Sequence, residues 1–295
     1  MKIEVVKGLF ENRWAENLSE EEYHADKTAV NSSSLKEMIR SPAAYYDAYV
    51  NGKKPTKAMK FGTLAHMAIL EGDKFRSRYV VEPVFQGMTQ NGIMSERSKV
   101  ALQKKAEWYQ SLPQGTTVVT KEELDMLLRM IDSMVNNKDA FEILSKGKAE
   151  AKGYFVDEET GLKCRFMADF ISFNLNALVD IKTTTDCKWE KFRSSVEELR
   201  YDVQMAMYEQ GVKAITGKSS DHRLWLTIET VRNFECRVHE VDPMYDETGL
   251  YEYRYCMKRL SDCIKENKFP QGQVLIEYGQ PSFWFKQEYQ LKGVL

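Results

Sequence analysis

Hydrophobic and polar residues alternate with a period of two between positions 165 and 184, which predicts two short β-strands joined by a turn. The turn is expected at Asn174 and Leu175, so that the two strands form an antiparallel hairpin. Counting back along the ladder from this turn places Asp169 opposite Asp180.

The two faces of this hairpin are expected to differ in chemistry. Successive side chains point to opposite faces of a strand, so Asp180 and Lys182 point the same way and Asp169 joins them. Like charges directly opposite each other repel, and two bare carboxylates there would cost stability unless a cation lay between them. The other face is expected to be an apolar packing surface formed by Ala168, Phe170, Val179 and Ile181.

Apolar spacing and capping residues predict the remaining elements. A capping box at Ser34 and Glu37 is expected to open a helix near Leu35, and a second capping box at Thr120 and Glu123 opens another. Strands are predicted within residues 149–156 and 222–241, and helices over residues 35–40, 43–50, 60–72, 95–110, 121–135, 196–216 and 246–267. The tail, residues 273–285, reads as an edge strand or an oligomer contact.

Composition is that of a soluble globular protein, with 43% hydrophobic and 29% charged residues in 295. We expect a single domain over residues 1–295, in which residues 1–60 are a helical N-terminal elaboration and residues 61–295 the core. No apolar run is long enough to cross a membrane and no secretory leader is visible, so a cytoplasmic protein without a membrane partner is expected. The five cysteines are too scattered for a disulfide framework.

Charge is distributed unevenly although the net charge is only −2. Residues 11–25 hold five Glu against one Arg, whereas residues 32–60 hold six Lys and Arg against two acids. Such asymmetry can guide a polyanion to one face of a nearly neutral molecule. An ordinary mixed surface explains the same composition.

Two carboxylates facing each other suit Mg²⁺ or Mn²⁺, which prefer oxygen ligands and retain several waters. A metal there can activate a water molecule for attack on a phosphodiester. Lys182 could orient that nucleophile or stabilise developing charge. The alternative is a surface hairpin whose Asp and Lys side chains are merely solvated.

Asp169 followed by Asp180-Ile181-Lys182 resembles the motif of the PD-(D/E)XK nuclease superfamily, with Asp in place of the commoner Glu. Gly62–His66, leading to Leu70-Glu71, is similar to the helix motif of the RecB-like branch, where the glycine permits close backbone approach. Gln204 and Tyr208 resemble the Gln-x-x-x-Tyr helix motif of that branch. The serine-rich residues 31–46 are most similar to the exonuclease VIII (RecE-type) nuclease domain, and lambda exonuclease is a more distant relative.

The resemblance implies an α/β, restriction-endonuclease-like core: a mixed central β-sheet flanked by helices, with a helical N-terminal elaboration. It implies that Lys182 assists the attacking water while Gln204 and Tyr208 support the site. The metal ligands it implies are His66, Asp169, Asp180, the backbone carbonyl of Ile181 and, near a second metal, Glu150.

The implied activity is Mg²⁺-dependent 5′→3′ digestion of double-stranded DNA, which leaves 3′ single-stranded overhangs for recombination by strand annealing. Mn²⁺ is expected to substitute and Ca²⁺ to inhibit. The implied partners are DNA ends with a 5′-phosphate, further copies of the chain in a trimeric or tetrameric ring, and a RecT-type annealing protein, in a phage or prophage setting within a bacterial host cell.

Four residues are candidate DNA contacts. Ser33 and Arg40 lie near a helix N-terminus that could hold a phosphate, although a capped structural helix explains the serines equally well. Arg200 recurs four residues before Gln204 on the predicted long helix, and Arg193 precedes that helix.

Two alternatives to this function remain open. One is another RecB-like nuclease, with endonuclease, flap or 3′→5′ activity. The other is a DNA-binding or assembly module on the same fold that has no catalytic activity.

Overall fold

The computed structural model describes residues 1–6, 10–52, 54–85, 87–89, 92–94, 98–272 and 287, with backbone alone for 87–89 and 92–94. The strands are β1 (Arg13–Trp14), β2 (Tyr79–Val81), β3 (Gly87–Thr89), β4 (Gly92–Met94), β5 (Thr117–Val119), β6 (Gly147–Val156), β7 (Lys163–Ser172), β8 (Ala177–Thr184), β9 (His222–Glu229) and β10 (Cys236–Glu240). The helices are α1 (Glu20–Ala25), α2 (Ser32–Leu35), the 3₁₀ helix η1 (Lys36–Ile39), α3 (Pro42–Asn51), α4 (Lys57–Leu70), α5 (Gly72–Arg78), α6 (Lys99–Ser111), α7 (Lys121–Asn136), α8 (Lys138–Leu144), α9 (Trp189–Leu199), α10 (Tyr201–Thr216) and α11 (Pro243–Glu266).

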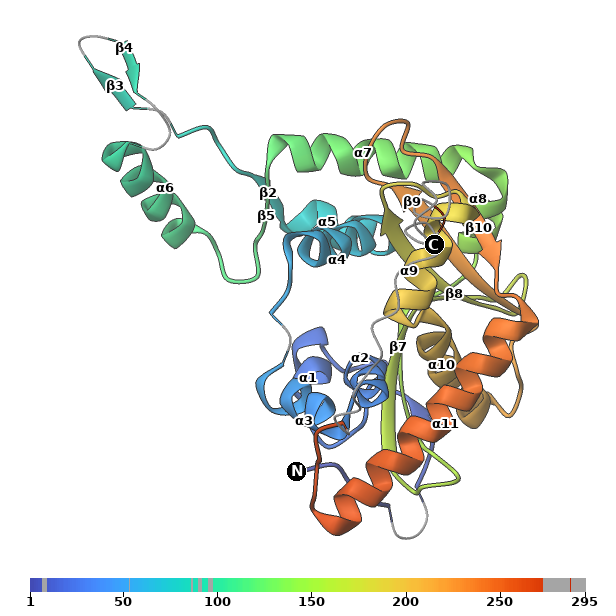
Figure 1. Cartoon of the computed structure of the whole chain (residues 1–295). Coiled ribbons are helices and arrows are strands. Elements are labelled where there is room, and N and C mark those ends of the chain that lie inside the picture. The colour runs from blue at the N-terminus through green and yellow to red at the C-terminus, as the bar shows by residue number, and fades with distance from the viewer. Residues whose placement is uncertain are drawn as a thin grey trace.

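A mixed six-stranded sheet, ordered β1-β6-β7-β8-β9-β10, forms the centre of the molecule (Figure 1). Neighbouring strands are antiparallel except for β8 and β9, which run parallel and are connected through α9 and α10. A tight turn joins antiparallel strands only. Two parallel neighbours run in the same direction, so the chain must cross back along the sheet between them. The predicted α/β fold with a mixed sheet flanked by helices is confirmed.

Helices cover both faces of the sheet and enclose two apolar clusters. The first cluster packs α2, α3, α10 and α11 against the sheet, and Leu178 of β8 belongs to it. The second packs α4, α5, α7 and α8 against the other face, and Val179 and Ile181 belong to it. Strand β8 therefore has a helical layer on each side, which explains why residues 177–181 are buried without interruption.

The predicted hairpin is formed, and its register is the predicted one. Ser172 pairs with Ala177 and Phe170 with Val179, which is the register predicted from the turn, although Asp169 and Asp180 lie just beyond the last pair. The turn is longer than expected, because the strands end at Ser172 and resume at Ala177.

A kink in the sheet overturns one part of the face prediction. Ala168 belongs to the first apolar cluster, whereas Phe170, an even-numbered neighbour on the same strand, belongs to the second. The switch occurs beside Glu150 of β6, whose φ of +47° is left-handed. Pairing of β6 with β7 is interrupted there, since Ala149 and Ala151 pair with Phe170 and Ala168 but Glu150 does not pair with Asp169. The prediction that Ala168 shares a face with Phe170, Val179 and Ile181 was therefore wrong.

The predicted helix over residues 196–216 is two helices. Arg200 has a left-handed backbone, with a φ of +51°, and separates α9 from α10. Its side chain forms a bidentate ion pair with Asp202 at 2.8–3.0 Å. Arg200 consequently does not continue the stripe of Gln204 and Tyr208 along one helix, and that expectation was wrong.

The N-terminal segment differs from prediction in two details. Asn31, not Ser34, caps α2, because the Asn31 side chain accepts a hydrogen bond from the Ser34 amide at 3.0 Å. This segment is also not purely helical, since Arg13–Trp14 adds edge strand β1 to the sheet. The capping box at Thr120 and Glu123 is confirmed.

The predicted tail strand, residues 273–285, lies outside the described residues, as do the first residues of the helix predicted over 95–110. Within the described part of the chain, no helix is both long and apolar enough to cross a membrane. All five cysteines are buried free thiols. A single domain remains a prediction.

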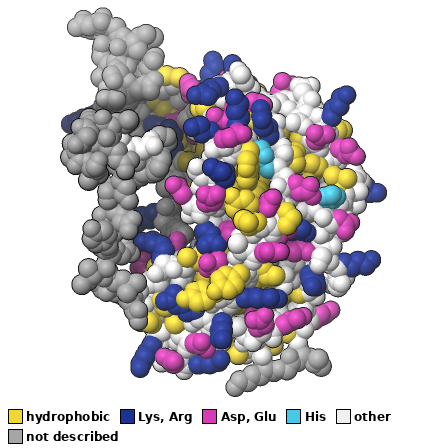
Figure 2. Space-filling model, turned by 45° about the vertical axis from the view of Figure 1, so that its right-hand side comes forward, with side chains coloured by type: hydrophobic (Ala, Val, Ile, Leu, Met, Phe, Trp, Pro, Cys, Tyr) yellow, Lys and Arg dark blue, Asp and Glu magenta, His cyan; other side chains and the backbone are white. Residues whose placement is uncertain are grey.

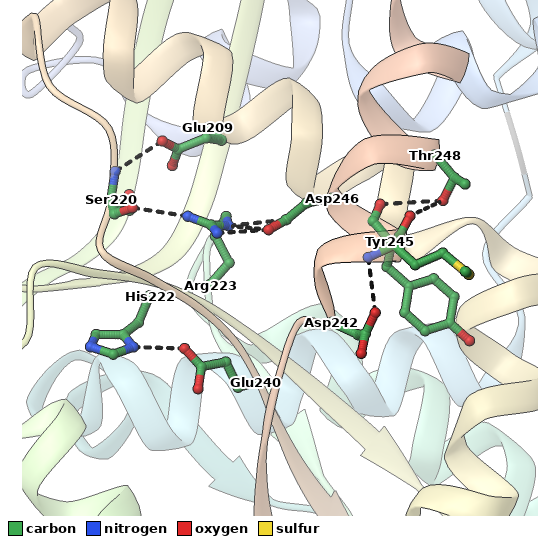
Figure 3. A network of polar contacts seen from close by, with 10 residues as sticks. Glu209, Ser220, His222, Arg223, Glu240, Asp242, Tyr245, Asp246 and Thr248 are labelled. Carbon is green, nitrogen blue, oxygen red and sulfur yellow. Dashed lines mark hydrogen bonds and ion pairs between the residues drawn. The ribbon is translucent and has the colours of Figure 1, made fainter.

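A polar network fastens α10, β9 and α11 together (Figure 3). The Arg223 guanidinium donates to both carboxylate oxygens of Asp246 at 2.6–2.9 Å and to the Ser220 carbonyl at 2.9 Å. Glu209 accepts from the Ser220 amide at 2.9 Å.

The face of the molecule in Figure 2 carries acidic, basic and apolar side chains side by side, so no extended patch of one charge covers it.

Gly211 of α10 provides the close approach of this helix to the sheet. A Cβ atom at this position would overlap the buried Phe166 ring of β7. We expect Gly211→Ala to lower the free energy of unfolding by about 1–3 kcal/mol through overpacking, measured by chemical denaturation. Gly72→Ala in α5 is the control, because nothing lies within 4 Å of its Cβ position and no loss is expected. Equal stability of the two variants would contradict this view of the helix–sheet contact.

Candidate active site

Strands β7 and β8 separate just where the two predicted acids lie. Their pairing ends at Phe170 and Val179, while β8 continues alongside β9 to Thr184. Asp169 bridges the opening, because its Oδ2 accepts a hydrogen bond from the Ile181 amide at 2.6 Å. The Asp169 side chain thus replaces the missing backbone partner of Ile181. Beyond Val179, the edge of β8 that would pair with β7 faces the opening.

His66 enters this opening from α4. Its Nε2 lies 3.0 Å from the Ile181 carbonyl oxygen, and its Nδ1 lies 3.4 Å from Asp169 Oδ1. Three predicted metal ligands, His66, Asp169 and the Ile181 carbonyl, are therefore brought together from α4, β7 and β8. Gly62 is not needed for this approach, since a Cβ there would make only an ordinary contact with Thr183 Oγ1 at 3.6 Å.

Asp180 lies on the other side of Ile181 with both oxygens engaged. Its Oδ2 is 2.5 Å from Lys182 Nζ, and its Oδ1 accepts from Gln204 Nε2 at 2.8 Å. Gln204 Nε2 also lies 3.2 Å from the Tyr208 hydroxyl. Four predicted site residues are thus linked by consecutive polar contacts: Lys182, Asp180, Gln204 and Tyr208.

Burial separates this site from a solvated surface hairpin. Asp180 is 1% exposed and Asp169 is 7% exposed. Two carboxylates held this deeply cost free energy unless cations or donors compensate them. The alternative of solvated Asp and Lys side chains is therefore wrong.

The titration of the four charged groups reflects this crowding. Burial raises the pKa of Asp180, and the charge of Asp169 adds to the effect. Burial acts in the same direction on Asp169, but the nearby His66 and Lys182 outweigh it and lower its pKa. Burial opposes the charge on His66, yet Asp169 raises its pKa to about 9. Lys182 is also desolvated, and its two acidic neighbours nevertheless raise its pKa, which keeps it an ammonium.

Glu150 completes a compact group of ligating atoms. One ligand atom each from His66, Glu150 and Asp169 lie within 4.8 Å of one another. Burial and the charge of Asp169 raise the pKa of Glu150 to about 7. Asp180 is not part of this group, and its role as a ligand remains a prediction.

The donor set fits a hard divalent cation. Two carboxylates and a backbone carbonyl provide the oxygen ligands that Mg²⁺ and Mn²⁺ prefer, and one imidazole is compatible with Mn²⁺. The ion would also relieve the repulsion among Glu150, Asp169 and Asp180. Metal binding must displace protons from His66 and Glu150, since ligands bind in their deprotonated forms.

The four predicted DNA contacts are not among the residues that meet in this opening. Ser33 lines a cavity between α1, α2, α3 and β7. Arg40 is exposed and lies 3.3 Å from Glu37, and Arg193 is exposed and lies 3.8 Å from Glu197. Arg200 is held by Asp202 and lies 3.8 Å from Glu252. DNA binding by these four residues stays a prediction.

Sequence reasoning missed Tyr201 and Arg165. The Tyr201 ring lies 4.6 Å from Lys182 Nζ, where it limits the freedom of the ammonium. Arg165 precedes Asp169 by four residues on β7 and is buried. Strand alternation placed it on the face of Asp169, a signal that was available in the sequence.

Comparison with known families identifies the architecture around this opening. The family model described as "PDDEXK-like domain of unknown function (DUF3799)" matches residues 31–280. The chain belongs to this PDDEXK-like family. No curated protein matches the chain.

Solved structures with this PDDEXK-like chain's architecture include one from Eubacterium rectale, described as a "Putative exonuclease". It has a TM-score of 0.57 and 17% identity, and the match covers 92% of this chain and 98% of the other. The two proteins therefore share a fold. A "phage related exonuclease" from Haemophilus somnus 129PT matches with a TM-score of 0.31 and 14% identity, covering 81% of this chain and 96% of the other.

Metal binding at this site is testable through stability. We expect Mn²⁺ to raise the melting temperature of the wild-type chain, because a ligand at 100 times its Kd stabilises the folded state by about 2.7 kcal/mol. Asp169→Asn should lose most of this shift, since the carboxylate lies among the ligating atoms. Differential scanning calorimetry with and without ion measures it.

The matched control for this test is Asp125→Asn, which alters an exposed acid paired with Arg129 on α7. Its response to Mn²⁺ should equal that of the wild type. An unchanged shift in Asp169→Asn would show that the ion binds elsewhere.

Proposed function

We propose that this chain is a divalent-metal-dependent deoxyribonuclease that digests double-stranded DNA from its ends. The observation that carries the proposal is the convergence of His66, Asp169 and the Ile181 carbonyl in the opening between β7 and β8, with the Asp180–Lys182 ion pair beside them. Membership in a PDDEXK-like family supports it.

Each residue has a task that its contacts define. His66, Asp169, the Ile181 carbonyl and, beside them, Glu150 and Asp180 would hold the ion, which supplies an activated water and neutralises phosphate charge. Lys182 places a permanent positive charge next to Asp180, where it stabilises negative charge developing on the scissile phosphate. Gln204 fixes the Asp180 carboxylate by its 2.8 Å hydrogen bond, and Tyr208 orients Gln204.

The finer proposal follows the resemblance to RecE-type nucleases. At each duplex end the enzyme would degrade the strand whose 5′ terminus lies there, in the 5′→3′ direction. The complementary strand would remain as a 3′ overhang for strand annealing. A ring of three or four subunits would enclose the duplex, and a RecT-type protein would receive the single strand in a phage recombination module. Mg²⁺ would be the working ion, with Mn²⁺ as a substitute and Ca²⁺ as an inhibitor.

Linear and closed circular duplexes distinguish this proposal from its alternatives. With Mg²⁺, the wild-type chain should release nucleotides progressively from the 5′ end of a linear duplex labelled at one end, and should leave a closed circle intact. Cleavage of the circle would favour an endonuclease, and loss of label from the 3′ end would reverse the polarity. Absence of cleavage on both substrates would favour a binding module.

Lys182→Ala separates catalysis from binding. Removing one preorganised charge that acts on the transition state should reduce the cleavage rate by about 10²–10³-fold, while duplex binding in Ca²⁺ changes little. Lys121→Ala on the exposed start of α7 is the control and should cleave normally. Wild-type rates in the Lys182 variant would refute the role assigned to this residue.

A further inference from the structure

The contact between Lys182 and Asp180 is an ion pair without a directed hydrogen bond. Lys182 Nζ lies 2.5 Å from Asp180 Oδ2, yet this buried oxygen has no hydrogen-bond partner of suitable geometry among the described residues. The other oxygen of the carboxylate accepts a hydrogen bond from Gln204. An oxygen in this state can accept a further positive partner, and Asp180 cannot then hold Lys182 with its full charge. Lys182 therefore needs a second contact to stay in place.

The Tyr201 ring provides this second contact. Its centroid lies 4.6 Å from Lys182 Nζ, which is within the range of a cation–π interaction. The Lys182 side chain is only 14% exposed, and such an interaction is stronger for a desolvated ammonium than for a solvated one. The ring attracts the ammonium without adding negative charge to a site that already holds several carboxylates.

The break between α9 and α10 places this ring beside Lys182. Arg200 has a left-handed backbone and its guanidinium is held by Asp202, so α10 starts at Tyr201. Lys36 of η1 holds the end of α9, because its Nζ donates to the Leu199 carbonyl at 2.8 Å and lies 5.5 Å from the Tyr201 ring. The ring also packs against the first apolar cluster. The backbone on either side of Tyr201 is thus fixed, which limits the movement of the ring.

We propose that Tyr201 is a positioning residue for Lys182, and that its ring holds the ammonium where it stabilises charge on the scissile phosphate while Asp180 serves as a metal ligand. Tyr201 acts through Lys182 and not on the reacting atoms themselves. The role requires an aromatic face and not a hydroxyl group. This inference rests on the proposed nuclease function, which it deepens by naming the group that keeps Lys182 in its working position.

The kinetics of linear duplex digestion with Mg²⁺ test this role. Tyr201→Leu removes the ring but keeps an apolar side chain, and it should lower kcat about 5- to 30-fold, the loss that corresponds to a desolvated cation–π contact. KM should change little, because the ammonium acts on the transition state and not on duplex binding. Tyr201→Phe keeps the ring and should retain most of the rate. Tyr251→Leu is the matched control, since Tyr251 is an exposed tyrosine of α11, and it should cleave normally.

A double-mutant cycle separates the positioning of Lys182 from a general structural effect. In the Lys182→Ala background, Tyr201→Leu should cause no further loss of kcat, since the group that Tyr201 positions is already absent. An equal loss in both backgrounds would overturn the proposal, because Tyr201 would then act on something other than Lys182. Tyr201→Met, which also lacks a ring, replaces Tyr201→Leu if that variant does not fold.

NMR spectra of the full-length chain with ¹³C-labelled lysine detect the contact itself, in the presence of a chelator and without DNA. Protons that lie over an aromatic ring resonate upfield. The ε-methylene protons of Lys182, assigned by their loss in Lys182→Ala, should therefore be shifted upfield in the wild type and in Tyr201→Phe. In Tyr201→Leu they should return to the ordinary lysine position. An unshifted wild-type signal would overturn the proposal.

The two measurements distinguish failure of this inference from failure of the nuclease function. A wild-type chain that cleaves no DNA would refute the nuclease function and the role of Tyr201 in cleavage with it, even if the upfield shift is found. Normal kcat in Tyr201→Leu, beside an active wild type, would refute the role of Tyr201 alone.

Discussion

The hydrogen bond from the Ile181 amide to the Asp169 carboxylate is the contact on which the site depends. Where β7 and β8 separate, a backbone amide needs a partner, and an unpaired buried amide would be costly. Asp169 provides that partner with one oxygen and presents the other to His66. The same contact thus holds the opening in shape and fixes an acidic group inside it. The price is a concentration of negative charge that His66 and Lys182 only partly offset.

The kink at Glu150 explains why the opening lies where it does. A left-handed residue interrupts the pairing of β6 with β7 beside Asp169, so both strands change the face that they present to the two helical layers. Beyond this point β7 packs toward α4 and α7, and before it toward α10 and α11. Asp169 lies between Ala168, which packs in the first apolar cluster, and Phe170, which packs in the second. The Asp169 carboxylate there meets His66 from one layer and the Ile181 amide, while Asp180 meets Gln204 from the other layer.

Much of this arrangement could be predicted from the sequence. The period of two predicted the hairpin and its register, and the resemblance to PD-(D/E)XK nucleases selected His66, Asp169, Asp180, Lys182 and Gln204 as site residues. The kink could not be predicted, because alternation assumes a continuous ladder and Glu150 carries no sign of a left-handed backbone. The break at Arg200 was missed for the same reason, since neither glycine nor asparagine marks it. Arg165 was overlooked although strand alternation places it on the face of Asp169, because its burial becomes visible only when the surrounding residues are known.

The parallel pairing of β8 with β9 determines when the candidate site can form during synthesis. Asp180 and Lys182 lie on β8, an inner strand whose second neighbour, His222–Glu229, is translated some forty residues later. Until β9 emerges from the ribosome, β8 lacks its parallel neighbour and Asp180 and Lys182 lack their final surroundings. A nascent chain that ends before β9 lacks this neighbour, so the order of the strands delays completion of the proposed site until residues 222–229 have been made.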